Sequence, residues 1–176
     1  MSFYSQKIYL SNKRVFCLLL DFFFNFAQQK KLMFSKTCEY AIRAMIFIAQ
    51  KSKGGSKVGI KEIAKAIDAP EYFIAKILQD LSRKGLVQSL KGPTGGFYVE
   101  DESSLCSLAD IVKAIDGDKL FTGCGLGLKN CNELRPCPIH NQFKKVRESI
   151  YNMLENATIG EFGKQLEKNL AFLKRK

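Results

Sequence analysis

Apolar residues recur at helical spacing as soon as the chain passes Met33. Steps of three and four residues place one face of a helix toward a core, which predicts a helix over residues 35–50. Its apolar stripe is formed by Tyr40, Ala41, Ala44, Met45, Phe47, Ile48 and Ala49. The polar, glycine-containing stretch 51–57 is expected to end it.

Two further amphipathic helices are predicted, separated by a tight break. The first covers residues 60–67 and ends at Asp68. Pro70 suits the first turn of the second helix, which is expected to stop at Gly85 after two basic residues. The inward face of the first helix is predicted to be Ile63, Ala64 and Ile67. That of the second is predicted to be Phe73, Ile74, Ile77, Leu78 and Leu81.

A β-hairpin is predicted directly after these helices. Residues 86–90 and 97–99 have strand character, and the Lys-Gly-Pro-Thr-Gly-Gly sequence between them favours a turn. Three helices followed by a hairpin is the order of a winged helix-turn-helix. The helix pair could instead be a plain helical hairpin in a core, but the lysine at the hairpin tip favours the DNA-binding interpretation.

The remainder of the chain predicts helices on either side of an irregular loop. A short helix is expected over residues 108–115, and residues 124–140 are rich in glycine, proline and cysteine. A longer helix over 141–157 has an apolar seam close to a heptad, for which a second copy of the chain is a natural partner. A last helix over 158–173 begins with a Thr-x-x-Glu cap.

These elements predict a mainly α fold with a small β-hairpin. The winged helix-turn-helix domain is assigned to residues 33–100, and the linking helix with the cysteine loop to residues 101–140. Residues 141–176 would supply the dimerisation helix and the C-terminal helix. Residues 1–32 lack the periodicity that begins at Met33, and we interpret them as an N-terminal extension that results from a mis-assigned start.

The charge of the chain favours a polyanionic partner. The 176 residues carry a net charge of +11, with a pI of about 9.4. Residues 1–32 contain five basic residues and one acidic residue, so the rest of the chain keeps +7. A nucleic acid, an anionic membrane surface and a merely solvated surface all agree with this charge. The apolar run near residues 15–26 is interrupted and is too short to span a membrane, so no membrane partner is predicted.

Three of the six cysteines lie within 14 residues. A secreted disulfide framework would need a signal peptide, and no small-residue cleavage site follows the apolar run. A helical, Lys/Glu-rich chain suits a reducing cytosol, where clustered cysteines are more often metal ligands or redox thiols. We therefore predict a cytoplasmic protein.

The spacing Cys124-x6-Cys131-x5-Cys137-x2-His140 matches two kinds of metal site. Three thiolates and an imidazole could hold structural zinc or an iron–sulfur cluster. Zinc usually takes its cysteines in tighter pairs, so the wide spacings favour the cluster. Free thiols without a metal remain the alternative. A catalytic Cys–His pair lacks an orienting third residue, and the protein is predicted not to be an enzyme.

These segments resemble the winged-helix iron–sulfur repressors, the family that includes IscR and NsrR. The resemblance covers residues 33–173. It is carried by MFSKTCEYAIRAM, by EIAKAIDAPEYFIAKILQDLSRKGLVQSLKGPTGGFYV, by SLADIVKAIDG and by the three-cysteine loop. The wing motif is quite specific, and the cysteine trio in that position is more so.

The resemblance implies a homodimer that addresses a near-palindromic double-stranded DNA operator. It also implies a cluster on Cys124, Cys131 and Cys137. The fourth ligand is a histidine in IscR-like members, which His140 matches, and in other members an acidic residue near the start of the first helix, reached from the partner subunit, near which Glu39 lies. We favour His140 because it lies in the same loop. The first gap is one residue longer than in IscR-like members. A two-iron cluster is favoured and a four-iron cluster is possible.

The second helix of the pair is predicted to lie in the major groove. Outward residues there could contact bases or phosphates, and the wing tip could touch the backbone. The predicted DNA-binding residues are Glu71, Tyr72, Lys76, Lys91 and Thr94. The predicted function is a transcriptional repressor controlled by a cluster that senses redox state, nitric oxide or iron. The alternative is a zinc-stapled or metal-free regulator that acts through a protein partner.

Overall fold

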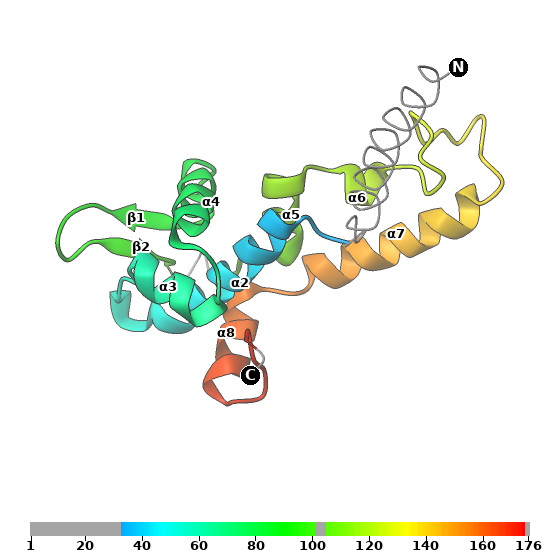
Figure 1. Ribbon diagram of the computed structural model, residues 1–176. Helices are drawn as coiled ribbons and strands as arrows, with labels where there is room; N and C mark the ends of the chain where they lie inside the picture. Colours follow the sequence, from blue (N-terminus) through cyan, green and yellow to red (C-terminus); the bar gives the residue numbers. More distant parts are fainter. Residues whose placement is uncertain (1–32, 101–104, 175–176) are drawn as a thin grey trace, which may run out of the picture. The chain divides into compact units, whose positions relative to one another are not determined.

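The computed structural model describes residues 33–100 and 105–174 (Figure 1). The prediction for residues 1–32 lies outside the described residues. No helix in the described ranges is long and apolar enough to cross a membrane.

Helix α2 (Lys36–Lys51) is the centre of the core. The Ser35 side chain caps it by accepting a hydrogen bond from the backbone N–H of Cys38 at 3.1 Å. Its fully buried face includes Met45 and Ile48. Helices α3, α4, α5 and α8 all pack against α2, so the first predicted helix organises the whole fold.

Helices α3 (Ile60–Ile67) and α4 (Glu71–Arg83) form the helix-turn-helix. Asp68 adopts a left-handed conformation, with φ of 54°, and ends α3. Pro70 is the N-cap of α4, one position before the predicted first turn. Gly85, with φ of 75°, follows the end of α4 as predicted.

The predicted inward face of α4 is confirmed except at one position. Ile74, Ile77, Leu78 and Leu81 are buried, whereas Phe73 is 52% exposed. Successive helical residues differ by about 100°, so Phe73 lies at the flank of the buried stripe and its ring meets the Tyr72 ring edge-on.

The wing is a two-stranded antiparallel sheet of β1 (Gln88–Leu90) and β2 (Gly96–Tyr98). Ser89 lies opposite Phe97, and Val58 pairs with Phe97 on the other edge through two backbone hydrogen bonds of 2.9 Å. A Cβ on Gly96 would lie 2.8 Å from the Val58 carbonyl oxygen. The double glycine of the wing motif therefore permits this close backbone approach.

The second half of the chain contains α5 (Leu108–Asp116), α6 (Lys119–Thr122), α7 (His140–Glu155) and α8 (Ile159–Glu167). Ser107 and Asp110 form a capping box at the start of α5. The short α6 was not predicted, and α8 is shorter than expected. The 3-10 turn η1 (Lys53–Gly55) lies in the predicted polar stretch.

Helix α7 begins at His140, so this histidine belongs to the helix and not to the loop in which it was predicted. Leu154, near the other end of α7, packs against Cys38 of α2 and against Ala109 and Val112 of α5. Figure 1 shows the cysteine loop at the N-terminal end of α7, while the chain beyond its C-terminal end leads into α8. Helix α7 thus connects the loop to the core that carries the helix-turn-helix.

Candidate functional site

The outward face of α4 carries the residues that were predicted to reach DNA. Glu71, Tyr72 and Lys76 are all exposed, and Tyr72 is 76% exposed. On the wing, Lys91 and Thr94 are exposed in the turn between β1 and β2. These five side chains are therefore exposed to solvent on helix α4 and on the adjacent wing.

A groove between α4 and the wing adds residues that sequence reasoning missed. Gln79 and Arg83 line it from the helix, and Ser89 and Lys91 line it from the hairpin. Gln79 lies three residues after Lys76 and Arg83 lies four after Gln79, so the helical period could have found both. Arg83 also pairs with Asp80 at 3.1 Å. The groove joins amide, hydroxyl and cationic donors beside the predicted reading helix.

The four predicted metal ligands form two close pairs. The sulfur atoms of Cys124 and Cys137 are 3.9 Å apart, and Cys131 Sγ lies 3.4 Å from His140 Nδ1. His140 is buried, and its backbone N–H donates to the Cys137 carbonyl at 2.9 Å. Among the described residues no three His, Cys, Asp or Glu side chains are placed to hold one metal ion together.

Each pair has the spacing of two ligands on one tetrahedral metal. A thiolate–metal bond of about 2.3 Å gives a sulfur–sulfur edge of about 3.8 Å, and an imidazole at about 2.0–2.1 Å gives a sulfur–nitrogen edge of about 3.5 Å. The distances of 3.9 and 3.4 Å agree with both. Each pair could therefore supply two of the ligands of one metal ion.

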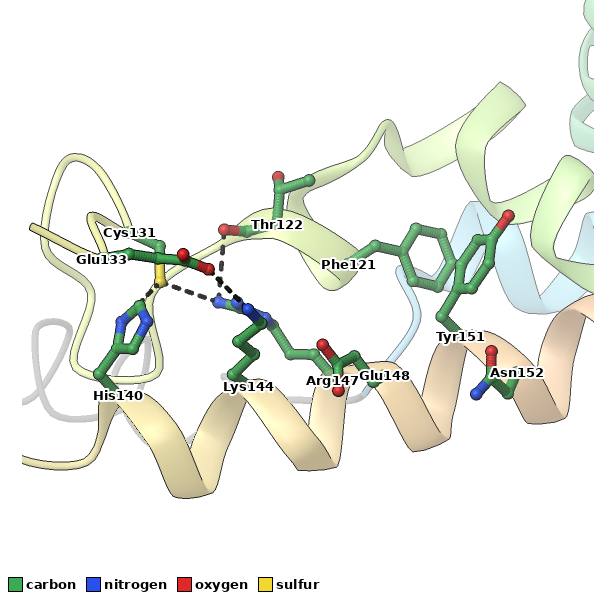
Figure 2. A pocket seen from close by; sticks show the side chains of 10 residues that line it. All are labelled: Phe121, Thr122, Cys131, Glu133, His140, Lys144, Arg147, Glu148, Tyr151 and Asn152. Carbon is green, nitrogen blue, oxygen red and sulfur yellow. Dashed lines mark hydrogen bonds and ion pairs between the residues drawn. The ribbon is translucent and has the colours of Figure 1, made fainter. Parts of the chain in front are cut away.

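An open pocket of about 500 Å³ adjoins the second pair (Figure 2). Cys131 and His140 line it from one end, and Phe121, Tyr151 and Asn152 lie toward the other. The imidazole and the thiol thus border free space, into which a bound group could extend.

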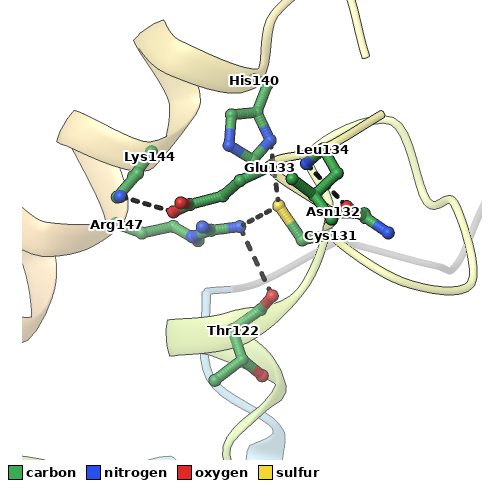
Figure 3. A network of polar contacts seen from close by, with 8 residues as sticks. All are labelled: Thr122, Cys131, Asn132, Glu133, Leu134, His140, Lys144 and Arg147. Atoms are coloured by element: carbon green, nitrogen blue, oxygen red, sulfur yellow. Dashed lines mark hydrogen bonds and ion pairs between the residues drawn. The ribbon is translucent and has the colours of Figure 1, made fainter. Parts of the chain in front are cut away.

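Arg147 of α7 contacts the cysteine loop directly (Figure 3). Its Nη1 donates to Cys131 Sγ at 3.2 Å, to the Thr122 carbonyl at 3.4 Å and to the Gly123 carbonyl. The neighbouring Lys144 pairs instead with Glu133 at 2.6 Å. Sequence reasoning missed Arg147 because nothing in the local pattern brings a residue of the predicted dimer helix to a thiol.

The pKa of Cys124 in the loop is shifted in the opposite direction from those of Cys38 and Cys106. The backbone N–H groups of Leu126 and Leu128 hold the pKa of the Cys124 thiol below its ordinary value, with smaller contributions from Cys137 and Arg147. In contrast, burial raises the pKa of both Cys38 and Cys106 to about 12. The surroundings of Cys124 thus favour the thiolate that binds metal, whereas burial keeps Cys38 and Cys106 neutral.

Glu39, the other predicted fourth ligand, lies in the first turn of α2. Its carboxylate is engaged with Lys36 at 2.8 Å. Of the two predicted fourth ligands, His140 is the one whose side chain lies beside a cysteine of the loop within this chain.

The geometry is that of a winged helix with a thiol-rich loop, and comparison with known proteins agrees with it. The model of the Rrf2 family, described as an iron-dependent transcriptional regulator, matches residues 34–165. The chain belongs to the Rrf2 family. Because Rrf2 proteins are DNA-binding transcriptional regulators, this chain is a transcriptional regulator and not an enzyme, as predicted.

Individual Rrf2 relatives are similar over most of the chain. An HTH-type transcriptional regulator of Aquifex aeolicus is 30% identical over 141 residues, which are 79% of this chain and 96% of that protein. The HTH-type transcriptional regulator IscR of Klebsiella pneumoniae is 27% identical over 122 residues, 69% of this chain and 74% of that one.

A solved Rrf2-like structure shares the fold. CymR, the global cysteine regulator of B. subtilis, is 20% identical, with a TM-score of 0.62 over 76% of this chain and 97% of that chain. The predicted winged-helix fold and the predicted family resemblance are both confirmed.

Proposed function

We propose that this Rrf2 protein is a homodimeric repressor whose binding to a near-palindromic operator is controlled by an iron–sulfur cluster. The observation that carries the proposal is the pairing of Cys124 with Cys137 and of Cys131 with His140 at metal-ligand spacing. These four residues would hold the cluster, with each pair on one iron. A zinc site needs its ligands around a single ion, so the two pairs favour a two-iron cluster over zinc.

DNA recognition is assigned to α4 and the wing. Glu71 can accept from a cytosine amino group, and Lys76 can donate to guanine in the major groove. Tyr72 would contact the sugar–phosphate backbone together with Lys91 and Thr94 of the wing. The groove beside them is lined by the cations Arg83 and Lys91, which would attract the phosphates of DNA.

Dimerisation is assigned to α7. Val146 and Met153 are 50% and 56% exposed on this helix, although both are apolar. They lie seven residues apart, which is one heptad, so they share a face that a second α7 could cover. The two recognition helices would then be held at a fixed separation, as a near-palindromic operator requires.

Control of DNA binding would pass through α7. A bound cluster would supply a redox-active centre that can be lost or can change its charge. Arg147 ties the cysteine loop and the end of α6 to α7, and Leu154 ties α7 to α2 and α5. A rearrangement of the loop would therefore move α7, the helix that sets the separation of the two recognition helices.

The test is an anaerobic purification followed by analysis of iron, sulfide and zinc. We expect a coloured protein with about two iron and two sulfide per chain. A four-iron content would change the cluster type but keep the sensor. Stoichiometric zinc without sulfide, or a protein free of metal, would contradict the proposal and favour a regulator that acts through a protein partner.

A further inference from the structure

Arg147 of α7 is a cation whose side chain reaches the sulfur of a proposed ligand, beside the proposed ligand His140 on the same helix. Its guanidinium donates to Cys131 Sγ and to the Thr122 carbonyl (Figure 3). It also donates to the Gly123 carbonyl. The two carbonyls lie at the C-terminal end of α6, which directly precedes the cysteine loop. One side chain thus fixes where the loop begins and where its central cysteine lies.

The same side chain keeps an unused donor. Arg147 Nε is buried and has no hydrogen-bond partner among the described residues. A guanidinium stays charged, and a buried donor without an acceptor is costly. An acceptor atom of a bound group could therefore complete this site.

Packing holds the guanidinium in place. It lies over the Phe143 ring, 5.7 Å from the centroid. That ring in turn lies against Gly125, where a Cβ would come within 2.8 Å of the ring carbons. A glycine directly after Cys124 is thus required for the ring to support Arg147.

Other cations near the loop do not have this geometry. Lys144 is one turn earlier on α7, but its ammonium pairs with Glu133. Arg135 lies in the loop itself and is exposed. Arg147 can donate to sulfur and Lys144 is engaged with a carboxylate, so the two cations of α7 have separate roles.

We propose that Arg147 is a positioning residue that donates an N–H···S hydrogen bond to the Cys131 ligand, raising the reduction potential of the bound cluster and slowing its loss. The inference rests on the proposed function. A hydrogen bond to a ligand sulfur and a nearby positive charge both favour the reduced cluster, which carries one more negative charge. They also hold Cys131 against dissociation when the cluster is attacked.

The experiment compares Arg147→Met, Arg147→Lys and the control Arg135→Met with the wild type. Each full chain is reconstituted anaerobically with ferrous iron and sulfide. The midpoint potential is measured by spectroelectrochemistry, and cluster loss is followed by visible absorption after addition of a chelator. Arg135→Met removes one positive charge from the cysteine loop at an exposed side chain, whereas Arg147 lies on α7 and donates to a thiol.

We expect Arg147→Met to shift the potential to more negative values and to speed cluster loss by about 10- to 100-fold, the range seen when outer-shell partners of a metal site are removed. Arg147→Lys keeps the charge but loses the planar fork, so it should fall between Arg147→Met and wild type. Arg135→Met should match wild type.

Wild-type potential and loss rate in Arg147→Met would overturn the inference and leave the proposed function intact, as would equal shifts in Arg147→Met and Arg135→Met. If Arg147→Met fails to fold, Arg147→Lys decides by the same two measurements, and wild-type values in it overturn the inference. A wild-type chain that takes up no iron and sulfide would overturn the proposed cofactor itself, and the inference with it.

Discussion

Helices α3 and α4 with the wing, called the reading head below, and the cysteine loop are stabilised by different interactions. In the head, residues such as Ile63, Ile74 and Leu78 are fully buried, and backbone hydrogen bonds pair the wing with Val58. In the loop, three leucines are 54%, 55% and 93% exposed, and sulfur contacts replace a core. We therefore expect the head to keep its shape by itself, and the loop to depend on the group that its thiols are proposed to bind.

The largest effect is expected on iron content, when one cysteine of the loop is removed. Cys124→Ala, Cys131→Ala and Cys137→Ala should each lose most or all of the iron, because two thiolates hold a cluster poorly. The head should stay folded, since its core contains none of them. Iron per chain and the thermal unfolding midpoint are measured together on anaerobically reconstituted protein. Full iron in all three variants would remove the cluster from the loop.

His140→Ala should lose less iron than the cysteine variants. A water molecule or a nearby carboxylate can replace one nitrogen ligand, so we expect faster cluster loss and a shifted potential rather than an empty protein. The same iron analysis, with spectroelectrochemistry, checks it. Iron retention equal to wild type, with an unchanged potential, would exclude His140 as a ligand.

The opposite change tests the head. Leu78→Ala should lower the free energy of unfolding by about 2–5 kcal/mol, because it leaves a cavity in a fully buried position. The matched control is Leu134→Ala in the loop, which is 93% exposed and should change it by less than about 0.5 kcal/mol. Urea unfolding followed by circular dichroism measures both. Equal effects would refute the contrast between the two regions.

The two regions also differ in how much of them the sequence predicts. Helix α3 and the wing follow from local signals, because apolar spacing, Asp68 and the double glycine act within a few residues. The cysteine trio is visible as a spacing. The contacts of Arg147 are not, because they join residues 16 to 25 positions apart in the chain.

The two errors have different origins. Phe73 has the apolar character of a core residue, and only the packing around α4 decides that it is exposed. His140 follows a proline-rich loop, and its inclusion in α7 depends on backbone bonds such as that from its N–H to Cys137. Tertiary packing thus overrides the apolar pattern at Phe73, whereas at His140 a backbone bond to the residue three positions earlier sets where the helix begins.

Thiol reactivity should separate the regions in the cluster-free chain. At pH 8 Cys124 should be alkylated far faster than Cys38 or Cys106, whose pKa is about 12. Each pKa unit changes the thiolate fraction about tenfold, so the rise from 9.0 to about 12 lowers the thiolate fraction of Cys38 and Cys106 roughly a thousandfold. Burial slows their alkylation further. Mass spectrometry after timed iodoacetamide treatment measures it, and comparable rates at all three would contradict the assignment.

The same pKa values predict a loss of stability in alkali. The folded state raises the pKa of Cys38 and Cys106, so their contribution is present below the unfolded value of about 8.5–9 and is lost as pH rises toward 12. Cys106→Ala should flatten this decline between pH 9 and 11. Urea unfolding across that range checks it, and an unchanged slope would contradict the prediction.

The smallest effect is expected from single phosphate contacts. Lys91→Ala should reduce the slope of log affinity against log salt by about 0.9, as expected for the loss of one phosphate contact. Lys129→Ala, an exposed lysine of the cysteine loop, should leave it unchanged. Fluorescence anisotropy on one duplex at several salt concentrations gives both slopes. Equal slopes for Lys91→Ala and wild type would remove the wing lysine from the interface.

If the loop controls the head, DNA affinity should differ between the chain with and the chain without the cluster. A duplex is first selected from a random-sequence library by the anaerobic protein in each state. Affinity for it is then measured at one salt concentration for the cluster-bound and the cluster-stripped chain. We expect the selected sequence to be near-palindromic. We expect the affinities of the cluster-bound and cluster-stripped chain to differ by about tenfold or more, equivalent to about 1.4 kcal/mol of coupling. Equal affinity in the two states would contradict it.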